Sequence, residues 1–295
     1  MTLPKITGEY RNDYSLSHLT WFKVGGVAKI FFKPSDCRDL ANFVAQNQQD
    51  KLVTVLGAGS NIIIRDGGID GVVIKLGQNF TNIELTNNNQ LSVGSSCLNF
   101  NLAKFCLAHS ISGFEFLSGI PGTIGGGIIM NAGAYGSEFK DIILAIEAIN
   151  PRGNLITITN EQIGFRYRDS NLPKDLIITK AFFRTMNGDR NIITEKINEI
   201  SRNRLATQPI KEHTGGSTFA NPENHKAWQL IDKAGMRGYK IGGASMSTLH
   251  CNFMINHGNA SALDLESLGN AVQKRVFEDS GISLKWEIKL IGNYV

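Results

Sequence analysis

The stretch VTVLGAGSNIII, residues 53–64, runs from a short apolar strand through two glycines into Ser-Asn and then into further β-branched residues. Tight turns of this kind point several backbone N–H groups into one concavity, which suits a pyrophosphate. A Rossmann fingerprint would require G-x-G-x-x-G opening a helix, but Ile62 stands at the third glycine position and the next residues favour a strand. The stretch therefore disfavours a Rossmann dehydrogenase. Taken alone, it fits both a phosphate-binding turn and a structural hairpin.

A second glycine-rich stretch, LSGIPGTIGGGIIMNAGAYG at residues 117–136, favours the ligand-binding interpretation. It holds seven glycines and no charged residue, whereas a solvated loop would carry clusters of Asp, Lys or Ser. The three consecutive glycines at 125–127 permit the backbone to approach a flat or anionic ligand closely. Tight packing between two lobes is the alternative explanation.

Hydrophobic periodicity divides the chain into three parts, at residues 1–80, 81–207 and 208–295. The first is a small α/β lobe, with strands at 28–33, 52–56 and 72–75 and a helix at 37–47. The second is an α+β lobe, with strands at 90–93, 142–149, 155–158 and 176–182 and helices at 99–108 and 194–205. We expect the strands at 142–149 and 155–158 to pair around the turn residues 150–154. The helix at 194–205 is expected to be amphipathic, with Ile197, Ile200 and Leu205 as its apolar residues. The third follows Gln208-Pro209 and holds helices at 226–234 and from 263 to before Gly281, with a strand at 288–291.

Composition excludes several classes of protein. The chain is 42% hydrophobic and 19% charged, with a net charge of +4 and no dense Lys/Arg run, so we expect no nucleic-acid partner. No run approaches 18 apolar residues, and residues 1–14 are polar, so we expect neither a membrane span nor a secretory signal. The four cysteines form no C-x-x-C pair and the six histidines lack ligand spacing, which favours a cytoplasmic protein with reduced thiols and no metal.

Seven motifs in order give a specific resemblance: TWFKVGGVA (20–28), VLGAGSN (55–61), DGGIDGVVI (66–74), the glycine-rich 119–136, FRYRDS (165–170), GGSTFANP (215–222) and residues 244–253 ending in HCNF. Together they span nearly the whole chain. The sequence resembles the UDP-N-acetylenolpyruvoylglucosamine reductase (MurB) family, in the flavoprotein superfamily that includes vanillyl-alcohol oxidase. The short third part implies the form of the family that lacks a tyrosine-bearing loop.

This resemblance implies an α+β fold, in which a two-lobed PCMH-type FAD-binding domain precedes a smaller α/β substrate-binding domain. It implies noncovalent FAD, NADPH as co-substrate, and reduction of UDP-N-acetylenolpyruvoylglucosamine to UDP-N-acetylmuramate for peptidoglycan synthesis. We expect a monomer. The implied FAD-binding residues lie in the two glycine-rich stretches: Gly57, Ala58, Gly59, Ser60, Asn61, Ile62, Pro121, Gly122, Thr123, Gly126, Asn131, Ala132 and Gly133.

Three residues match the family's catalytic positions. Adding hydride to the enol ether leaves charge that the substrate carboxylate accepts as an enolate, so a cation and a proton donor are needed. Arg168 matches the cation, although it could instead pair with Asp169 as a structural arginine. Ser217 matches the proton donor, with Thr218 as a rival hydroxyl. Glu287 matches the late glutamate that polarises the carboxylate.

Two of these matches depart locally from the family. Arg166 stands where the family often has glycine, so it is a second candidate for the arginine; if the stretch is extended, it points to the opposite face from Arg168. Trp286 stands where proline is common, just before the glutamate.

The implied substrate-binding residues are Asn221, Lys240 and Tyr167. His18 is the one histidine to compare with related oxidases, which attach FAD covalently through histidine; the family resembled here does not. The main alternative function is a sugar or alcohol oxidase of the same FAD-binding fold. A flavin-binding regulatory protein without turnover is a further alternative, which the arginine, serine and glutamate together disfavour.

Overall fold

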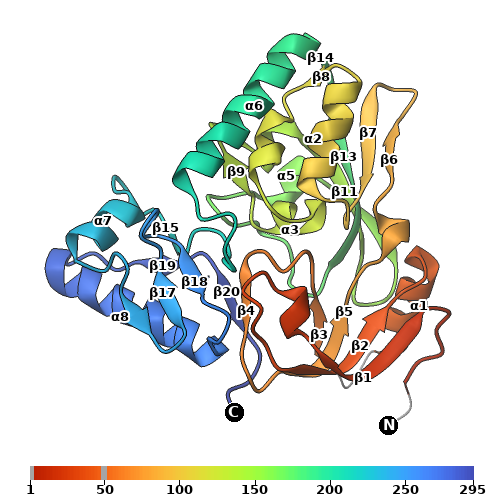
Figure 1. Ribbon diagram of the computed structural model, residues 1–295. Coiled ribbons are helices and arrows are strands. Elements are labelled where there is room, and N and C mark those ends of the chain that lie inside the picture. Colours follow the sequence, from red (N-terminus) through yellow and green to blue (C-terminus); the bar gives the residue numbers. More distant parts are fainter. Residues whose placement is uncertain (1–2, 48–51) are drawn as a thin grey trace. The chain divides into compact units, whose positions relative to one another are not determined.

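The computed structural model describes residues 3–47 and 52–295 (Figure 1). They form two compact units that are discontinuous in sequence. The first comprises Met1–Asn12, Ile30–Ala58 and Gly71–Arg202, and the second comprises Asp13–Lys29, Gly59–Asp70 and Asn203–Val295. The chain thus passes from one unit to the other between Ala58 and Gly59, inside the first glycine-rich stretch. The predicted three-part division stays a prediction.

A sheet with strand order β1-β2-β5-β3 opens the fold, formed by β1 (Glu9–Ser15), β2 (Val27–Lys33), β5 (Ile69–Ile74) and β3 (Val53–Val55). Strands β3 and β5 are parallel, with Val55 opposite Ile74. Helix α1 (Cys37–Gln46) is capped by Asp36, whose carboxylate accepts from Asp39 N at 2.8 Å. Leu40 and Phe43 of α1 share one buried cluster with apolar residues of β2 and β5, and Figure 1 shows the helix beside these strands. The predicted strands and helix of this part are confirmed.

An antiparallel sheet with strand order β12-β11-β13-β7-β6 forms the rest of the first unit. It consists of β12 (Leu155–Thr159), β11 (Ile143–Ile149), β13 (Ile177–Arg184), β7 (Gln90–Gly94) and β6 (Ile83–Leu85). The predicted pairing of the strands around residues 150–154 is confirmed, since β11 and β12 form a hairpin. Helix α2 (Asn99–Ala108) has the predicted bounds and buries Leu102 and Cys106.

Helix α6 (Arg190–Thr207) begins four residues before the predicted helix and ends two residues after it, and not all of its apolar residues are buried. Its buried side chains are Ile193 and Ile200, whereas Leu205 is 54% exposed. At 3.6 residues per turn, Leu205 lies about 140° around the helix from Ile200, outside the buried stripe. Apolar character alone was a poor guide to burial at the end of this helix.

Short elements complete the first unit and surround its core. They are η2 (Gln78–Phe80), β8 (Ile111–Ser112), η3 (Glu115–Gly119), α3 (Ile124–Ile129), β9 (Gly133–Ala134), β10 (Ser137–Glu138), α4 (Phe139–Ile142), α5 (Asn160–Ile163) and β14 (Met186–Asn187). The second glycine-rich stretch thus folds as η3, α3 and β9. Its apolar residues Leu117, Ile124 and Ile128 are fully buried in the core.

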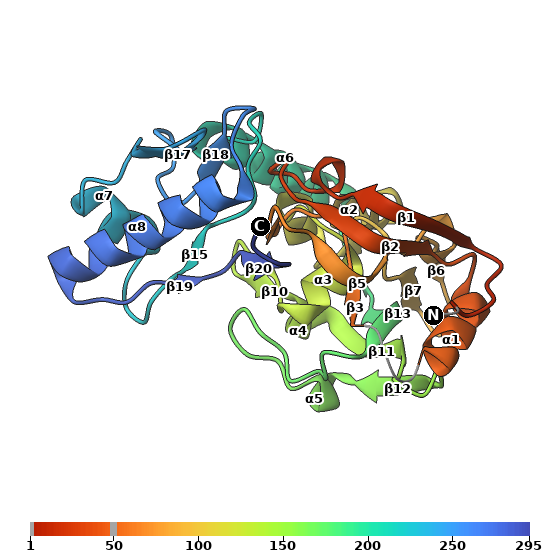
Figure 2. The same cartoon turned by 90° about the horizontal axis from the view of Figure 1, so that it is seen from below.

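Helices α7 (Ala227–Lys233) and α8 (Ala262–Ser280) dominate the second unit. Helix α8 ends before Gly281, as predicted, and Gly281 has the left-handed conformation that commonly ends a helix. Ser261 and Asp264 form a capping box at the start of the helix. Its apolar stripe packs on the sheet formed by β16 (Lys240–Ile241), β17 (Ala244–Met246) and β18 (Met254–Asn256), which Figure 2 shows alongside the helix.

The start and end of the second unit are joined by strand pairing. Strand β20 (Lys289–Ile291) pairs in parallel with β4 (Ile62–Ile64), and β19 (Lys285–Trp286) pairs with β15 (Phe219–Ala220); η1 (Ser17–Leu19) also lies in this unit. Arg65, just after β4, donates to both carboxylate oxygens of Glu266 at 2.8 and 2.9 Å. This forked pair holds the pKa of Glu266 below its usual range.

Within residues 3–47 and 52–295, no helix is both long and apolar enough to span a membrane, and no group of His, Cys, Asp and Glu side chains could hold a metal ion. All four cysteines are free thiols, and burial raises the pKa of Cys97 to about 11, which disfavours the reactive thiolate.

Candidate cofactor and catalytic site

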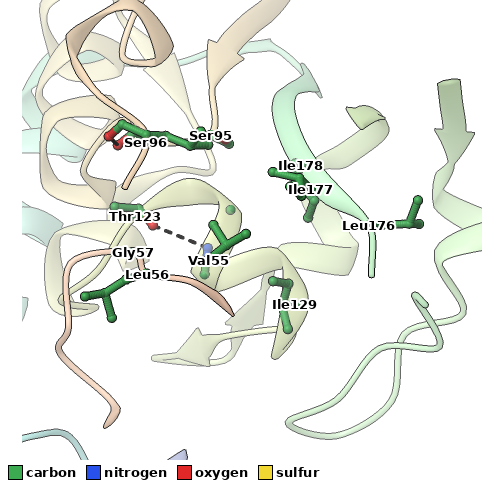
Figure 3. Close-up of a pocket in the computed structure, with 13 residues that line it drawn as sticks. Val55, Leu56, Gly57, Ser95, Ser96, Thr123, Ile129, Leu176, Ile177 and Ile178 are labelled. Atoms are coloured by element: carbon green, nitrogen blue, oxygen red, sulfur yellow. Dashed lines mark hydrogen bonds between the residues drawn. The ribbon is translucent and has the colours of Figure 1, made fainter. Parts of the chain in front are cut away.

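A pocket lies in the first unit where the two glycine-rich stretches meet (Figure 3). It encloses about 450 Å³, counting the open space at its mouth, and its walls are mostly apolar. The lining residues are Val55, Leu56, Gly57, Leu76, Ser95, Ser96, Thr123, Gly125, Gly126, Ile129, Leu176, Ile177 and Ile178.

The three consecutive glycines do not all face this pocket. A Cβ on Gly127 would lie 2.3 Å from the Phe139 ring, and one on Gly125 would lie 3.2 Å from Ser95 Cβ. Gly126 is exposed, and the nearest atom to its Cβ would be Thr123 Oγ1 at 3.4 Å. Tight packing therefore explains Gly125 and Gly127, and Gly126 alone retains the open approach expected of a ligand contact.

Two neighbouring substitutions in α3 should have opposite effects. Gly127→Ala should lower the free energy of unfolding by about 1–3 kcal/mol, because the methyl group overpacks the core at Phe139. Gly126→Ala should leave it unchanged or raise it by up to ~1 kcal/mol, because alanine is the better helix former. It should instead weaken FAD binding about tenfold or more by filling the pocket wall.

Denaturant unfolding of the apoprotein and flavin titration measure the two quantities separately. If Gly126→Ala binds FAD as tightly as the unchanged protein, Gly126 is not a cofactor contact.

The two glycines of the first stretch have different reasons for being glycine. A Cβ on Gly57 would lie 2.9 Å from Thr123 Oγ1, so this glycine permits close approach of the two glycine-rich stretches. Thr123 in turn accepts from Gly126 N, the bond that Figure 3 draws. Gly59 lies in the second unit with φ +69°, and its Cβ would lie 2.1 Å from Leu19 O, so local packing requires glycine there.

The pocket fits part of a flavin dinucleotide, because it is apolar, opens at Gly126 and contains an unused polar group. Ser95 is 3% exposed, and its hydroxyl has no hydrogen-bond partner within residues 3–47 and 52–295. A buried hydroxyl in an apolar pocket is costly unless a ligand completes its hydrogen bonding. Ser95 directly follows β7 and belongs to no recognisable motif, so the sequence alone does not mark it as a site residue.

Arg168 lies in a tight turn, and the extended geometry considered for this stretch was wrong. Arg166 and Asp169 form a β-bridge, with Tyr167 and Arg168 between them and Arg168 at φ +55°. Alternation along a strand therefore does not apply to Arg166 and Arg168. The Arg168 guanidinium donates to Gly133 O at 2.9 Å, so this side chain is held on the second glycine-rich stretch.

Asn131 is fully buried and is hydrogen-bonded to the same turn. Its Nδ2 donates to Arg166 O at 3.0 Å and to Glu138 Oε2 at 2.7 Å, while its Oδ1 accepts from Lys140 N at 3.1 Å. A predicted FAD-binding residue therefore has its polar atoms committed to the protein. This geometry points to a role for Asn131 in positioning the turn that carries Arg168. Its predicted contact with the cofactor remains a prediction.

Ser217 and Thr218 face different environments in the second unit. Ser217 is partly exposed, whereas Thr218 is fully buried and its hydroxyl has no hydrogen-bond partner in the described part of the chain. Both backbone polar groups of Thr218 are hydrogen-bonded: its N donates to Asn252 O at 2.7 Å, and its O accepts from Glu287 N at 2.9 Å. Burial therefore favours Ser217 over Thr218 as the hydroxyl that can reach a substrate.

The second half of the first glycine-rich stretch braces both Ser217 and Glu287. Ser60 O accepts from Gly216 N at 3.2 Å, one residue before Ser217. Asn61 Nδ2 donates to Glu287 O at 3.0 Å, and Asn61 O accepts from Lys289 N at 3.1 Å. The structure thus brings the candidate proton donor and the candidate glutamate together on the Ser-Asn pair of the predicted cofactor loop.

The predicted substrate-binding residues are all exposed. Asn221 Oδ1 accepts from Ala227 N at 2.9 Å, so its side chain supports the start of α7. The Tyr167 ring lies 5.0 Å from the Arg168 guanidinium carbon. Lys240 lies on β16, and nothing in its surroundings singles it out as a ligand contact. His18 Nε2 lies 3.0 Å from Tyr14 Oη.

Most of the other predicted cofactor residues lie outside helices and strands, while Ile62 lies on β4. Gly122 O accepts from Asn99 N at 3.0 Å, and Ala132 O accepts from Phe139 N at 3.1 Å. Ala58, Ile62 and Pro121 are each partly buried. The predicted cofactor residues of the first unit thus lie around the pocket and the Arg168 turn. Those of the second unit lie at Ser60 and Asn61, which are hydrogen-bonded to the segments of Ser217 and Glu287.

A small α/β lobe, an antiparallel α+β lobe and a glycine-lined pocket define a flavoprotein of the two-lobed FAD-binding class. Residues 28–159 match the family described as "FAD binding domain", and residues 208–291 match "UDP-N-acetylenolpyruvoylglucosamine reductase, C-terminal domain". The chain belongs to the UDP-N-acetylenolpyruvoylglucosamine reductase family.

Full-length relatives support this assignment. The chain is 68% identical over 295 residues to the UDP-N-acetylenolpyruvoylglucosamine reductase of Rickettsia felis, with 100% of both chains covered. It is also 68% identical to that of Rickettsia canadensis, again with 100% of both chains covered. The expected family, α+β fold class and FAD-binding domain are confirmed.

Solved structures agree. The crystal structure of the reductase (MurB) from Thermus caldophilus matches with a TM-score of 0.83 and 30% identity, covering 97% of this chain and 99% of that one. The 6-hydroxy-D-nicotine oxidase from Arthrobacter nicotinovorans matches with a TM-score of 0.62 but 11% identity, covering 97% and 89% of the two chains, which shows the shared fold alone. The oxidase alternative therefore has support only from the fold.

Proposed function

We propose that this protein reduces UDP-N-acetylenolpyruvoylglucosamine to UDP-N-acetylmuramate, with NADPH as the source of hydride. One observation carries the proposal beyond family membership. Asn61 and Ser60 fasten the segments of Ser217 and Glu287 to the predicted cofactor loop through hydrogen bonds of 3.0 and 3.2 Å. A hydroxyl and a carboxyl group held on that loop suit a reaction that delivers hydride and proton to adjacent carbons.

When bound, FAD would supply the hydride transfer, accepting a hydride from NADPH and passing it to the enolpyruvyl group. The residues of the chain handle binding, charge and the proton. The Arg168 guanidinium would bind the substrate carboxylate and stabilise the enolate that forms there. Its bond to Gly133 O orients the fork before the substrate arrives.

The Ser217 hydroxyl would then donate its proton to the α-carbon of the enolate. Glu287 would polarise the carboxylate, acting either as a neutral acid or through water or Arg168. Serine is a poor acid in water, so this role needs a short, fixed approach. The backbone bonds on both sides of Ser217, from Gly216 N to Ser60 O and from Thr218 N to Asn252 O, provide that rigidity.

Several further features belong to the same proposal. Asn221, Lys240 and Tyr167 contact the sugar nucleotide, and no tyrosine-bearing loop covers it. The enzyme acts as a monomer in the cytoplasm and has no nucleic-acid or membrane partner. Residues 1–80 and 81–207 form the two lobes around FAD, and residues 208–295 form the substrate-binding domain.

Anaerobic flavin spectroscopy tests the proposal. The purified protein should be yellow, or become so on uptake of FAD. NADPH should bleach the flavin absorption, and UDP-N-acetylenolpyruvoylglucosamine should restore it. A colourless protein that takes up no FAD would end the proposal, and rapid turnover of oxygen without NADPH would support the oxidase instead.

A further inference from the structure

Lys75 emerges at the edge of the sheet where the first glycine-rich stretch begins. Strands β3 and β5 are parallel, so their carboxyl ends meet at one edge, with Val55 opposite Ile74 and Leu56 N donating to Ile74 O at 2.9 Å. Ligands of open α/β sheets bind outside such an edge. Lys75 directly follows β5, and its Nζ donates to Gly57 O.

The charge of Lys75 has no partner among residues 3–47 and 52–295. The side chain is partly buried, and burial is the sole cause that lowers its pKa; no described carboxylate acts to raise it. A cation removed from water without a counter-charge destabilises a fold, so such a group is typically completed by an anion. A bound anionic ligand is the partner that this position lacks.

A second polar group points to the same ligand position. Gly57, which accepts from Lys75, and Ser95, whose buried hydroxyl has no partner, line the same pocket. The rest of that pocket is mostly apolar, and Gly57 approaches Thr123 closely. One ammonium and one unused hydroxyl at a glycine turn match the needs of a dinucleotide diphosphate, which requires both positive charge and hydrogen-bond donors.

We propose that Lys75 is a binding residue for the diphosphate of FAD, held at the glycine turn by the Gly57 carbonyl and assisted by the Ser95 hydroxyl. This inference rests on the FAD-binding part of the proposed function and not on the identity of the reduced substrate. The competing explanation is that Lys75 only anchors the Gly57 carbonyl.

Titration of the flavin-free, full-length protein with FAD separates these explanations, with flavin fluorescence as the signal. Lys75→Met keeps the length and the apolar stem but removes the charge, and should weaken FAD binding about 10- to 100-fold. Lys75→Arg keeps the charge and should retain most of the affinity. Ser95→Ala should weaken binding less, about 3- to 10-fold, because it removes one neutral hydrogen bond.

The salt dependence of binding tests the role of charge directly. The FAD dissociation constant of the unchanged protein should rise with NaCl concentration, and that of Lys75→Met should rise less steeply. Thermal unfolding of the flavin-free protein gives an independent measurement: Lys75→Met should unfold at the same or a higher temperature, because it removes a buried, uncompensated charge.

Each failure has its own signature. If the unchanged protein takes up no FAD, the proposed function fails with this inference. If it takes up FAD with no salt dependence, or if Lys75→Met binds FAD equally tightly, only the role of Lys75 is overturned. A lower unfolding temperature in Lys75→Met together with an unchanged salt dependence would identify a structural anchor. If Lys75→Met does not fold, Lys75→Gln and the salt dependence of the unchanged protein decide.

Discussion

Ser217→Ala is expected to slow reduction of the enolpyruvyl substrate by roughly two or more orders of magnitude while leaving flavin reduction by NADPH intact. The reason is that a proton donor serves only the second half-reaction. The hydroxyl is partly exposed, whereas its backbone neighbours are fixed by hydrogen bonds to Ser60 and Asn252. Removing it therefore takes away the proton and leaves the segment in place. Stopped-flow spectroscopy under anaerobic conditions measures the two half-reactions separately.

Thr218→Val is the matched control. The Thr218 hydroxyl is fully buried without a partner, so an isosteric valine should preserve turnover and leave stability unchanged or higher. Equal losses in both half-reactions of Ser217→Ala would contradict the proton-donor role. Loss of substrate reduction in Thr218→Val, with Ser217→Ala active, would transfer that role to the neighbour.

Arg168→Lys is expected to reduce the rate of substrate reduction by roughly 10²–10³-fold, again without slowing flavin reduction by NADPH. Lysine keeps the charge but lacks the planar fork that binds a carboxylate through two parallel hydrogen bonds. The guanidinium also donates to Gly133 O at 2.9 Å, a bond that fixes its direction. A single ammonium cannot serve both partners with the same geometry, so the loss should appear mainly in the rate of the chemical step.

Arg166→Lys provides the comparison, because the sequence left the choice between the two arginines open. Arg166 contributes its backbone to the turn, with its O accepting from Asn131 and its N donating to Asp169 O at 2.9 Å, and its side chain is exposed. The substitution should therefore change substrate reduction less than threefold, about the effect of a surface change. The reverse pattern would assign the carboxylate contact to Arg166.

Local signals predicted most of the fold. Helix α2 has the predicted bounds, α8 ends at Gly281, and the hairpin of β11 and β12 forms around residues 150–154. These elements succeed because their periodicity, caps and turn residues all favour the same structure. In α6 the apolar residue Leu205 is exposed, although it belongs to an amphipathic helix. Its burial depends on what the helix packs against and not on the helix's own residues.

The candidate site was only partly predictable for the same reason. Family motifs gave Arg168, Ser217 and Glu287, but only coordinates distinguish Gly126 from Gly127 or Ser217 from Thr218. Those distinctions depend on partners distant in sequence, such as Phe139 for Gly127 and Asn252 for Thr218. Lys75 belongs to no motif that the sequence analysis could recognise. Its significance appears only in the structure, where no carboxylate of residues 3–47 and 52–295 balances its charge.

The parallel pairing of β20 with β4 also has a consequence for how the chain folds during synthesis. Strand β4 (Ile62–Ile64) leaves the ribosome long before its partner Lys289–Ile291, which lies far later in the sequence. Contacts of such high sequence separation slow folding, since the loop between them must close first. Until then β4 and the Arg65 side chain lack their partners, Ile291 and Glu266. We therefore expect the second unit to be the last to become protease-resistant and the one most exposed to chaperones.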